Sequence, residues 1–147
     1  MERQEFTADV ADLVLSIARK IAATDVVAPD IVALSNVESL VMRHIDRNPG
    51  ISPSRIADQL GLRTANVSAI LRQLEQKRLV RRAHADADRR AVEVHPTAVA
   101  SRNLSRLREE WAARLDDVVP TVDQAAGEAV LGFLKGLDAG FDGARTR

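Results

Sequence analysis

Apolar residues recur every three or four positions in several long stretches of the chain, which is the pattern of helices with one buried face. Such stretches predict helices over residues 2–24, 34–47 and 98–118. A last helix is expected before Gly140, because Thr121 and Gln124 have the spacing of a capping box ahead of an apolar stripe that ends at Leu137.

Two shorter helices are predicted between residues 52 and 78. Ser52 can cap the first turn, and Pro53 suits the first helical position because its missing N–H has no partner there. Gly61 can adopt the left-handed conformation that ends a helix. The next helix, over residues 64–78, buries one stripe, which consists of Val67, Ile70, Leu71 and Leu74.

The hydrophobic period then changes from about 3.6 to 2, which predicts strands over residues 79–84 and 91–95. The polar segment 85–90 between them has the length of a hairpin connection. The predicted fold class is therefore mainly α with a small β-hairpin wing (α+β). Helix, turn, helix and hairpin, in this order, form a winged helix-turn-helix.

Length and composition exclude several classes of protein. The chain has 147 residues, the length of one domain, and 46% of them are apolar. No stretch approaches the ~20 apolar residues of a membrane-spanning helix, and residues 1–19 do not resemble a secretory signal. We therefore expect a cytoplasmic protein without a membrane partner. The absence of cysteine excludes disulfides, thiolate metal sites and thiol redox switching.

The net charge is zero, but the charges are unevenly distributed. Residues 52–95 contain nine Lys and Arg and five Asp and Glu, a net charge of +4, so the rest of the chain carries −4. A basic middle between acidic ends indicates a surface that faces a polyanion. Aromatic residues make up only 3%, which argues against stacking platforms for single-stranded nucleic acid.

The helix over residues 64–78 offers side chains that suit the major groove of double-stranded DNA. Its buried stripe leaves the outer face and leading end to Arg63, Thr64, Ala65, Asn66, Ser68 and Arg72. Asn can pair with adenine, Arg with guanine, and Ala can touch a thymine methyl group. We expect Arg63 to contact phosphate and Thr64 to cap the helix. The other interpretation is an ordinary solvated helix face.

The preceding helix and the hairpin add candidate contacts to the DNA backbone. Ser54 and Arg55 are expected to touch it from the preceding helix. Only one of Arg81 and Arg82 is expected to reach phosphate, because adjacent strand residues face opposite sides, and we favour Arg81. Arg89 and Arg90 are expected at the minor groove, with Asp86 or Asp88 pairing to one of them. The alternative is an exposed charge cluster.

Two runs of sequence resemble the multiple-antibiotic-resistance regulator (MarR) family. Residues 51–62 resemble that family's third helix, and residues 66–80 resemble its recognition helix and the entry to its wing. The segment 86–91, Asp-Ala-Asp-Arg-Arg-Ala, is similar to the wing signature that precedes a strand and a capping Thr97. The resemblance covers nearly the whole chain, since the order and lengths of six helices also fit.

Three positions depart from the family pattern. The family often has Gly where Arg78 stands, although Arg can still turn the chain there. It often has a basic residue where Ala69 stands, so sequence readout here rests more on Asn66, Ser68 and the wing. Pro96 replaces the usual Leu before the capping Thr97 and still permits a helix to start.

The resemblance implies an obligate homodimer that binds double-stranded DNA as a transcriptional regulator, with repression as the expected mode. In this interpretation residues 31–97 form the DNA-binding lobe, and residues 2–24 and 98–139 form the dimerisation helices. The apolar stripes of those helices fit a dimer independently, because an isolated lobe does not need them. The alternative is that they fold back on their own domain. Release by a small-molecule inducer, and whether His44 lines a ligand cleft, stay open.

Functions of other classes have less support. A winged helix that binds another protein in place of DNA is the main alternative, and the basic outer face argues against it. No nucleophile elbow, phosphate-binding loop or metal-ligand spacing supports catalysis, and no cofactor is expected. His84 and His95 fall on the two strands and could be cross-strand neighbours, but a metal site would need further ligands.

Overall fold

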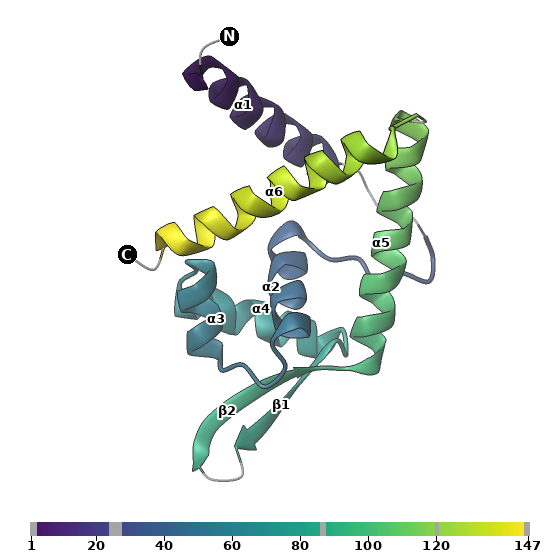
Figure 1. The fold of residues 1–147 in the computed structure, drawn as a ribbon. Helices are drawn as coiled ribbons and strands as arrows, with labels where there is room; N and C mark the ends of the chain where they lie inside the picture. Colours follow the sequence, from purple (N-terminus) through teal and green to yellow (C-terminus); the bar gives the residue numbers. More distant parts are fainter. Residues whose placement is uncertain (1–2, 24–27, 86–87, 120, 146–147) are drawn as a thin grey trace.

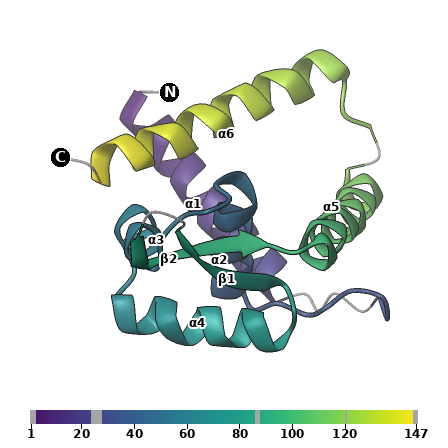
Figure 2. The ribbon, with the colours of Figure 1, turned by 90° about the horizontal axis from the view of Figure 1, so that it is seen from below.

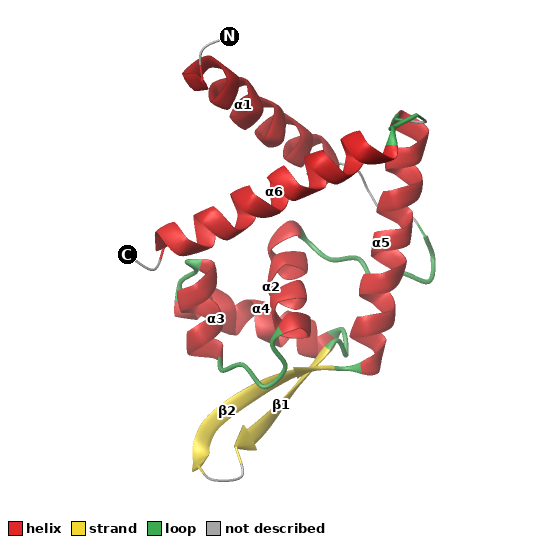
Figure 3. Ribbon diagram, in the orientation of Figure 1, coloured by secondary structure: helices red, strands yellow, loops and turns green. Residues whose placement is uncertain are grey.

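The computed structural model of the chain describes residues 3–23, 28–85, 88–119 and 121–145. Along the chain the elements are α1 (Arg3–Ala22), α2 (Asn36–Arg47), α3 (Pro53–Leu60), α4 (Thr64–Gln76), β1 (Val80–Ala85), β2 (Asp88–Pro96), α5 (Ala98–Val118) and α6 (Gln124–Arg145) (Figure 1). Figure 3 shows that helices dominate and that the two strands form a single projecting hairpin. This confirms the predicted fold class.

The core lies in the lobe that α2, α3, α4 and the base of the hairpin form. Its fully buried side chains are Val41, Met42, Ile45, Ile56, Val67, Leu71, Leu74, Leu79 and Val94. The first half of α5 closes one side of the lobe with Ala100, Leu104 and Leu107. Burying one Val or Leu side chain stabilises a protein by roughly 1.5–3 kcal/mol, so this cluster holds the lobe together.

The predicted ends of α3 are confirmed. Ser52 caps the helix, since its Oγ accepts a hydrogen bond from the main-chain N–H of Arg55, and Pro53 occupies the first turn. Gly61 ends it in the left-handed conformation with φ of 64°. The start of α5 is also as expected, because the Thr97 side chain accepts a hydrogen bond from Ala100 N.

Three predicted helix ends are wrong. The cap of α6 is Asp123, whose carboxylate accepts from Ala126 N, whereas Thr121 lies before the helix and Gln124 bonds to Glu128 instead of reaching back. Thr64 is the first residue of α4 and does not cap it; Arg63 holds the cap position without a side-chain hydrogen bond. The last helix continues beyond Gly140 to Arg145.

The hairpin is longer than its sequence pattern predicts. β2 begins at Asp88, so residues 88–90 belong to a strand and not to the connection. Alternation is obscured there because charged residues follow one another. The register pairs Arg81 with His95 and His84 with Val92, so the two histidines are not cross-strand neighbours. An isolated bridge from Ile51 to Val94 attaches the hairpin to the segment before α3.

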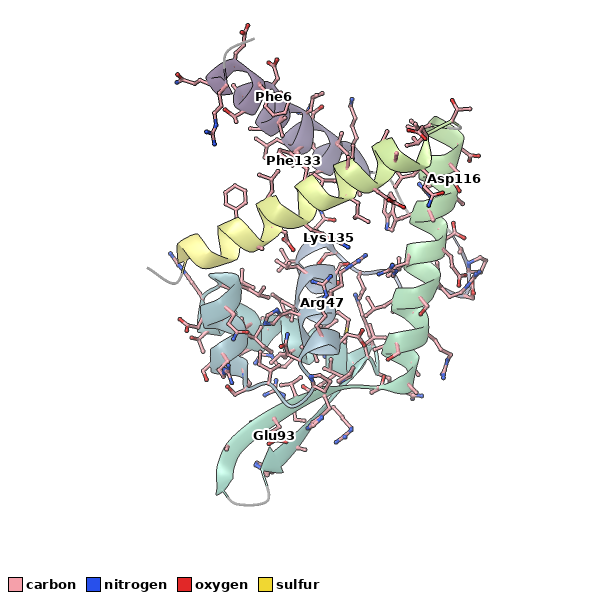
Figure 4. All side chains as sticks on the ribbon, in the orientation of Figure 1. Phe6, Arg47, Glu93, Asp116, Phe133 and Lys135 are labelled. Atoms are coloured by element: carbon pink, nitrogen blue, oxygen red, sulfur yellow. The ribbon has the colours of Figure 1, made fainter. Side chains whose placement is uncertain are left out.

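The helices α1 and α6 lie together at the end of the molecule away from the hairpin (Figure 1). Phe6 and Phe133, labelled in Figure 4, meet edge to face with ring centroids 6.4 Å apart. These helices and the end of α5 leave large apolar side chains exposed, including Phe6, Leu13, Leu15, Ile17, Leu115, Val118, Val130, Leu131, Phe133, Leu134 and Phe141. An apolar surface of this kind is typical of an interface.

Candidate nucleic-acid interface

The helix α4 is held at a fixed angle by the turn that precedes it. After Gly61 reverses the chain, Leu62 N donates to Ala57 O over 2.8 Å, and the Leu62 side chain packs against the core. Figure 2 shows α4 along one edge of the lobe, on the side opposite to α6. The turn therefore presents one complete face of α4 to the outside.

The two faces of α4 divide as the sequence predicts. Val67, Ile70, Leu71 and Leu74 are buried, as predicted. The candidate groove-facing residues that are exposed are Arg63, Thr64, Ala65, Asn66 and Arg72, and Ser68 is half-buried. The structure thus brings these six residues together on one side of the helix and its leading end.

The candidate residues of α3 are exposed next to this face. Ser54 lies in the first turn, where its hydroxyl is 3.1 Å from that of Ser52. The Arg55 side chain is exposed, while its main-chain N–H is taken by the Ser52 cap. Both side chains can therefore reach a ligand without disturbing the helix.

The two arginines of β1 differ in their contacts. Arg82 Nε lies 3.1 Å from a carboxylate oxygen of Glu75, which ties β1 to α4. Arg81 is exposed, and the described residues provide no carboxylate partner for it. The predicted contact of Arg81 with phosphate stays a prediction.

The remaining hairpin candidates can be placed only in part. The backbone of Asp88, Arg89 and Arg90 runs in β2. Their side chains, and all of Asp86, lie outside what the structure describes. The predicted contacts of these four residues, including the pairing of an aspartate with an arginine, therefore stay predictions.

A partly buried ion pair fixes the far end of α4, and the sequence interpretation missed it. Lys77 Nζ lies 2.8 Å from both carboxylate oxygens of Glu38 and 2.9 Å from the main-chain oxygen of Ala33. Glu38 is 5% exposed and also completes a capping box with Ser35 at the start of α2. The spacing Ser-x-x-Glu could have revealed the capping box, but no local pattern indicates the partner 39 residues away.

The environment of Glu38 favours its charged form. Burial acts to raise the pKa of this carboxyl group, but the hydrogen bonds from Lys77 and from the Ser35 main chain outweigh burial. The pKa of Glu38 therefore lies below its ordinary value. A charged Glu38 keeps Lys77, and with it the end of α4, in place.

Arginines gather between α2 and α5 without matching carboxylates. Arg43 is half-buried and donates weakly to Ser39 Oγ at 3.4 Å. Burial and the neighbouring charges of Arg108 and Arg47 lower the pKa of Arg43. Among the described residues, no carboxylate forms an ion pair with Arg43, Arg47 or Arg108.

Two of the three histidines, His44 and His95, have local partners. His44 Nε2 lies 2.8 Å from Gln59 Oε1, and His95 Nε2 lies 3.1 Å from Glu93 Oε2. No group of three potential metal ligands occurs within the described ranges. An open groove of about 570 Å³ runs beside α5 and is lined by residues such as Val32, Arg102 and Arg106; His44 is not among those that line it.

Comparison with known proteins finds similarity to transcriptional regulators. Residues 34–91 match the model of the MarR family. A curated protein of Thauera aromatica, a "putative transcriptional regulatory protein for hcr operon", is 28% identical over 120 residues, which cover 82% of this chain and 68% of that protein. Among the helices of the described residues, none combines the length and the hydrophobicity that crossing a bilayer requires.

Solved structures of regulators share the fold. The transcriptional regulator SlyA superposes with a TM-score of 0.71 at 14% identity, covering 94% of this chain and 97% of that one. FabT of Streptococcus pneumoniae, solved in complex with DNA, gives 0.62 at 20% identity and covers 96% of both chains. The repressor CouR, bound to a 23-mer DNA duplex, gives 0.66 at 25% identity and covers 94% and 99%.

Proposed function

Because this chain belongs to the MarR family, we propose that it is a transcriptional regulator that binds a specific sequence of double-stranded DNA as a homodimer. The observation that carries the proposal is the exposed face of α4. Six polar, basic or small side chains lie there, on a helix held by a tight turn at one end and a partly buried ion pair at the other. A helix of this kind fits the major groove of B-DNA.

We assign base contacts to the middle of that face. Asn66, in the first turn of α4, can pair bidentately with adenine, and Arg72, further along the helix, with guanine; Ala65 precedes Asn66, and Ser68 lies between Asn66 and Arg72 in the chain. We assign phosphate contacts to Arg63 and Thr64 at the start of α4, to Ser54 and Arg55 of α3, and to Arg81 of β1. For the hairpin we propose that Arg89 and Arg90 reach the minor groove, with Asp86 or Asp88 pairing to one of them.

Homodimerisation is supported by the apolar side chains that α1, α6 and the end of α5 leave exposed. Phe133, Leu134 and Leu131 are each between 43% and 52% exposed. They do not belong to the hydrophobic core of the lobe. A two-fold axis through this surface would place two α4 helices about 34–36 Å apart, one turn of DNA. The expected operator is therefore a near-palindrome. The domain division follows, with residues 31–97 in the DNA-binding lobe and residues 2–24 and 98–139 in the dimerisation helices.

Repression by occlusion is the mode we propose, in the cytoplasm, where the dimer would cover an operator that overlaps a promoter. A small-molecule ligand would release it by binding preferentially to a dimer with the wrong spacing of its α4 helices. The cluster of Arg43, Arg47 and Arg108 supports a ligand with an acidic group, because an anion would neutralise cations that have no described carboxylate partner.

The alternative function is a winged helix that binds a protein partner and no DNA. The exposed face of α4 carries no large apolar side chain and no acid among its six candidate residues, which disfavours that alternative. The part of the chain that the structure describes offers no candidate catalytic set in support of an enzymatic function.

The test is selection of duplexes from a random pool, followed by fluorescence anisotropy with the selected duplex at low and high salt. The proposal predicts enrichment of a near-palindromic sequence and affinity that falls steeply with salt, because phosphate contacts release counterions. Arg90→Ala is expected to weaken binding without changing the melting temperature, and Arg3→Ala, at the far end of α1, serves as the control. Absence of any enriched sequence and of salt-dependent binding would refute DNA binding.

A further inference from the structure

A buried side chain of α5 is hydrogen-bonded to the segment that joins α1 to α2. Asn103 is 3% exposed, and its amide makes two hydrogen bonds to one residue: Val32 N donates to Oδ1 over 2.7 Å, and Nδ2 donates to Val32 O over 3.0 Å. Arg106 Nε adds an exposed ion pair at 2.9 Å to Asp30. The buried pair of hydrogen bonds fixes the segment to α5, because breaking it would leave polar groups without partners.

The next residue of the same segment is hydrogen-bonded to the residue at the end of α4. Lys77 Nζ donates to Ala33 O over 2.9 Å while it pairs with the buried carboxylate of Glu38. Val32 and Ala33 are adjacent in the segment between α1 and α2. Val32 is hydrogen-bonded to α5, and Ala33 is hydrogen-bonded to the residue at the end of α4. The segment thus links the two helices through side chains that come from residues 77 and 103.

A second, direct link joins α5 to the end of α4. Thr97, the cap of α5, donates its hydroxyl hydrogen to Arg78 O over 2.7 Å, and its main-chain N–H donates to Leu79 O over 3.0 Å. Thr97 and Asn103 are six residues apart, which is about 9 Å along a helix. One attachment would leave α5 free to pivot at its start, whereas two attachments separated along its axis fix its direction.

From this geometry we propose that Asn103 and Lys77 are positioning residues that set the orientation of the recognition helix α4 relative to the dimerisation helix α5. The inference rests on the proposed function, in which α5 carries the dimer surface and α4 reads DNA. The far half of α5 exposes Leu115 and Val118 to that surface, so any rotation of α5 about Thr97 changes the spacing of the two α4 helices. Residues 32–33 prevent this rotation because they are hydrogen-bonded both to Asn103 of α5 and to Lys77 at the end of α4.

The test is a distance measurement inside one chain, for which the cysteine-free sequence is suited. Gln73→Cys on α4 and Ala112→Cys on α5, both at exposed positions, would carry nitroxide labels, and labelled protein would be diluted into unlabelled protein so that only intrachain distances contribute. Pulsed electron-spin resonance then gives the distribution of the α4–α5 distance. Lys77→Met and Asn103→Leu each remove the hydrogen bonds to one residue of the segment while keeping a side chain of similar length or volume.

Each single variant is expected to broaden the distribution of the α4–α5 distance. The double variant is expected to broaden it no further, because the segment links α4 to α5 only while both side chains hold it, so the loss of either one breaks the link. Arg82→Ala is the matched control, since it breaks the ion pair to Glu75 at the same end of α4 without touching the segment, and it should leave the distribution narrow. An unchanged distribution in either folded single variant, or additive broadening in the double variant, would overturn the proposal.

The same labels distinguish this inference from the proposed function. Gln73→Cys alone, without dilution, reports the distance between the α4 helices of two copies. A missing intermolecular signal would refute the homodimer, whereas the intrachain measurement would still decide whether Asn103 and Lys77 fix α4 to α5.

Discussion

The main-chain oxygen of Arg78 accepts a 2.7 Å hydrogen bond from the Thr97 hydroxyl, so the corner after α4 is tied to the start of α5. Among the described residues other than glycine, Arg78 alone has a positive φ, at 59°. The left-handed conformation costs an L-residue roughly 1–2 kcal/mol. The lobe evidently tolerates that cost at the point where α4 must turn into β1.

Arg78→Gly is therefore expected to stabilise the protein. Glycine removes the cost of the left-handed conformation, and its greater freedom in the unfolded chain offsets part of the gain, so we expect an increase of up to about 1 kcal/mol. Urea unfolding measures it. Gly61→Ala, at a glycine with φ of 64°, should destabilise by about 1 kcal/mol. A clear loss of stability in Arg78→Gly would mean that the arginine side chain matters more than the backbone.

The Glu38–Lys77 pair predicts a pH dependence of stability. Because the folded state lowers the pKa of Glu38, the unfolded chain binds more protons as pH falls through the ordinary pKa of about 4.3. The contribution of Glu38 is thus complete above that value and is lost as pH falls through its folded pKa. Urea unfolding between pH 3 and 7 measures how the free energy of unfolding depends on pH. This dependence should be shallower for Glu38→Gln than for the parent protein.

Glu109→Gln provides the control for that prediction. Glu109 pairs with Arg106 on the exposed side of α5, and exposed pairs contribute little. Its variant should keep the slope of the parent protein. Equal slopes for the parent and Glu38→Gln would show that the pair is not held as described.

The arginine cluster predicts a response to multivalent anions. The lowered pKa of Arg43 means that its charge is held less favourably in the folded state than in the unfolded chain, so Arg108→Gln should raise the melting temperature. Sulfate should raise the melting temperature of the parent more than that of Arg108→Gln. Arg102→Gln, which removes an exposed charge from the same helix, should keep the full sulfate response. Identical responses in all three proteins would remove the support for an acidic ligand.

The apolar surface of α6 predicts the oligomeric state. The chain has a mass of 16.0 kDa, and light scattering should give about twice that value for the parent protein. Leu134→Asp places a charge on the exposed apolar face and should shift the mass to that of one chain. Gln73→Asp on α4 should remain a dimer. A parent protein with the mass of one chain would contradict the proposed dimer.

The sequence pattern was sufficient for features whose cause is local. The buried stripe of α4, the Ser52 cap and the turn at Gly61 each follow from residues within one helix, and the structure confirms them. The start of α6 was misplaced because Thr121 and Asp123 are both good caps, and the choice depends on where the chain leaves α5. Thr64 was misassigned because a threonine before a helix is a good cap, whereas here the helix already includes Thr64 and Arg63 holds the cap position.

The contacts that fix α4 were beyond the sequence pattern because they join distant residues. Lys77 meets Glu38 across 39 positions, and Asn103 meets Val32 across 71. A lysine near a helix end and an asparagine inside a helix are ordinary residues at those places. Only the fold brings them to one segment, which is why the outer face of α4 could be predicted and its support could not.

The measurement that tests the central claim most directly is the affinity of the parent, Asn66→Ala and Arg3→Ala for a selected duplex and a scrambled duplex at one salt concentration. A bidentate pair contributes roughly 1–3 kcal/mol of discrimination, so Asn66→Ala should lose on the order of tenfold in preference or more, while Arg3→Ala matches the parent. If Asn66→Ala retains the parent's full preference for the selected duplex, the exposed face of α4 does not read DNA through this residue, and the account is contradicted.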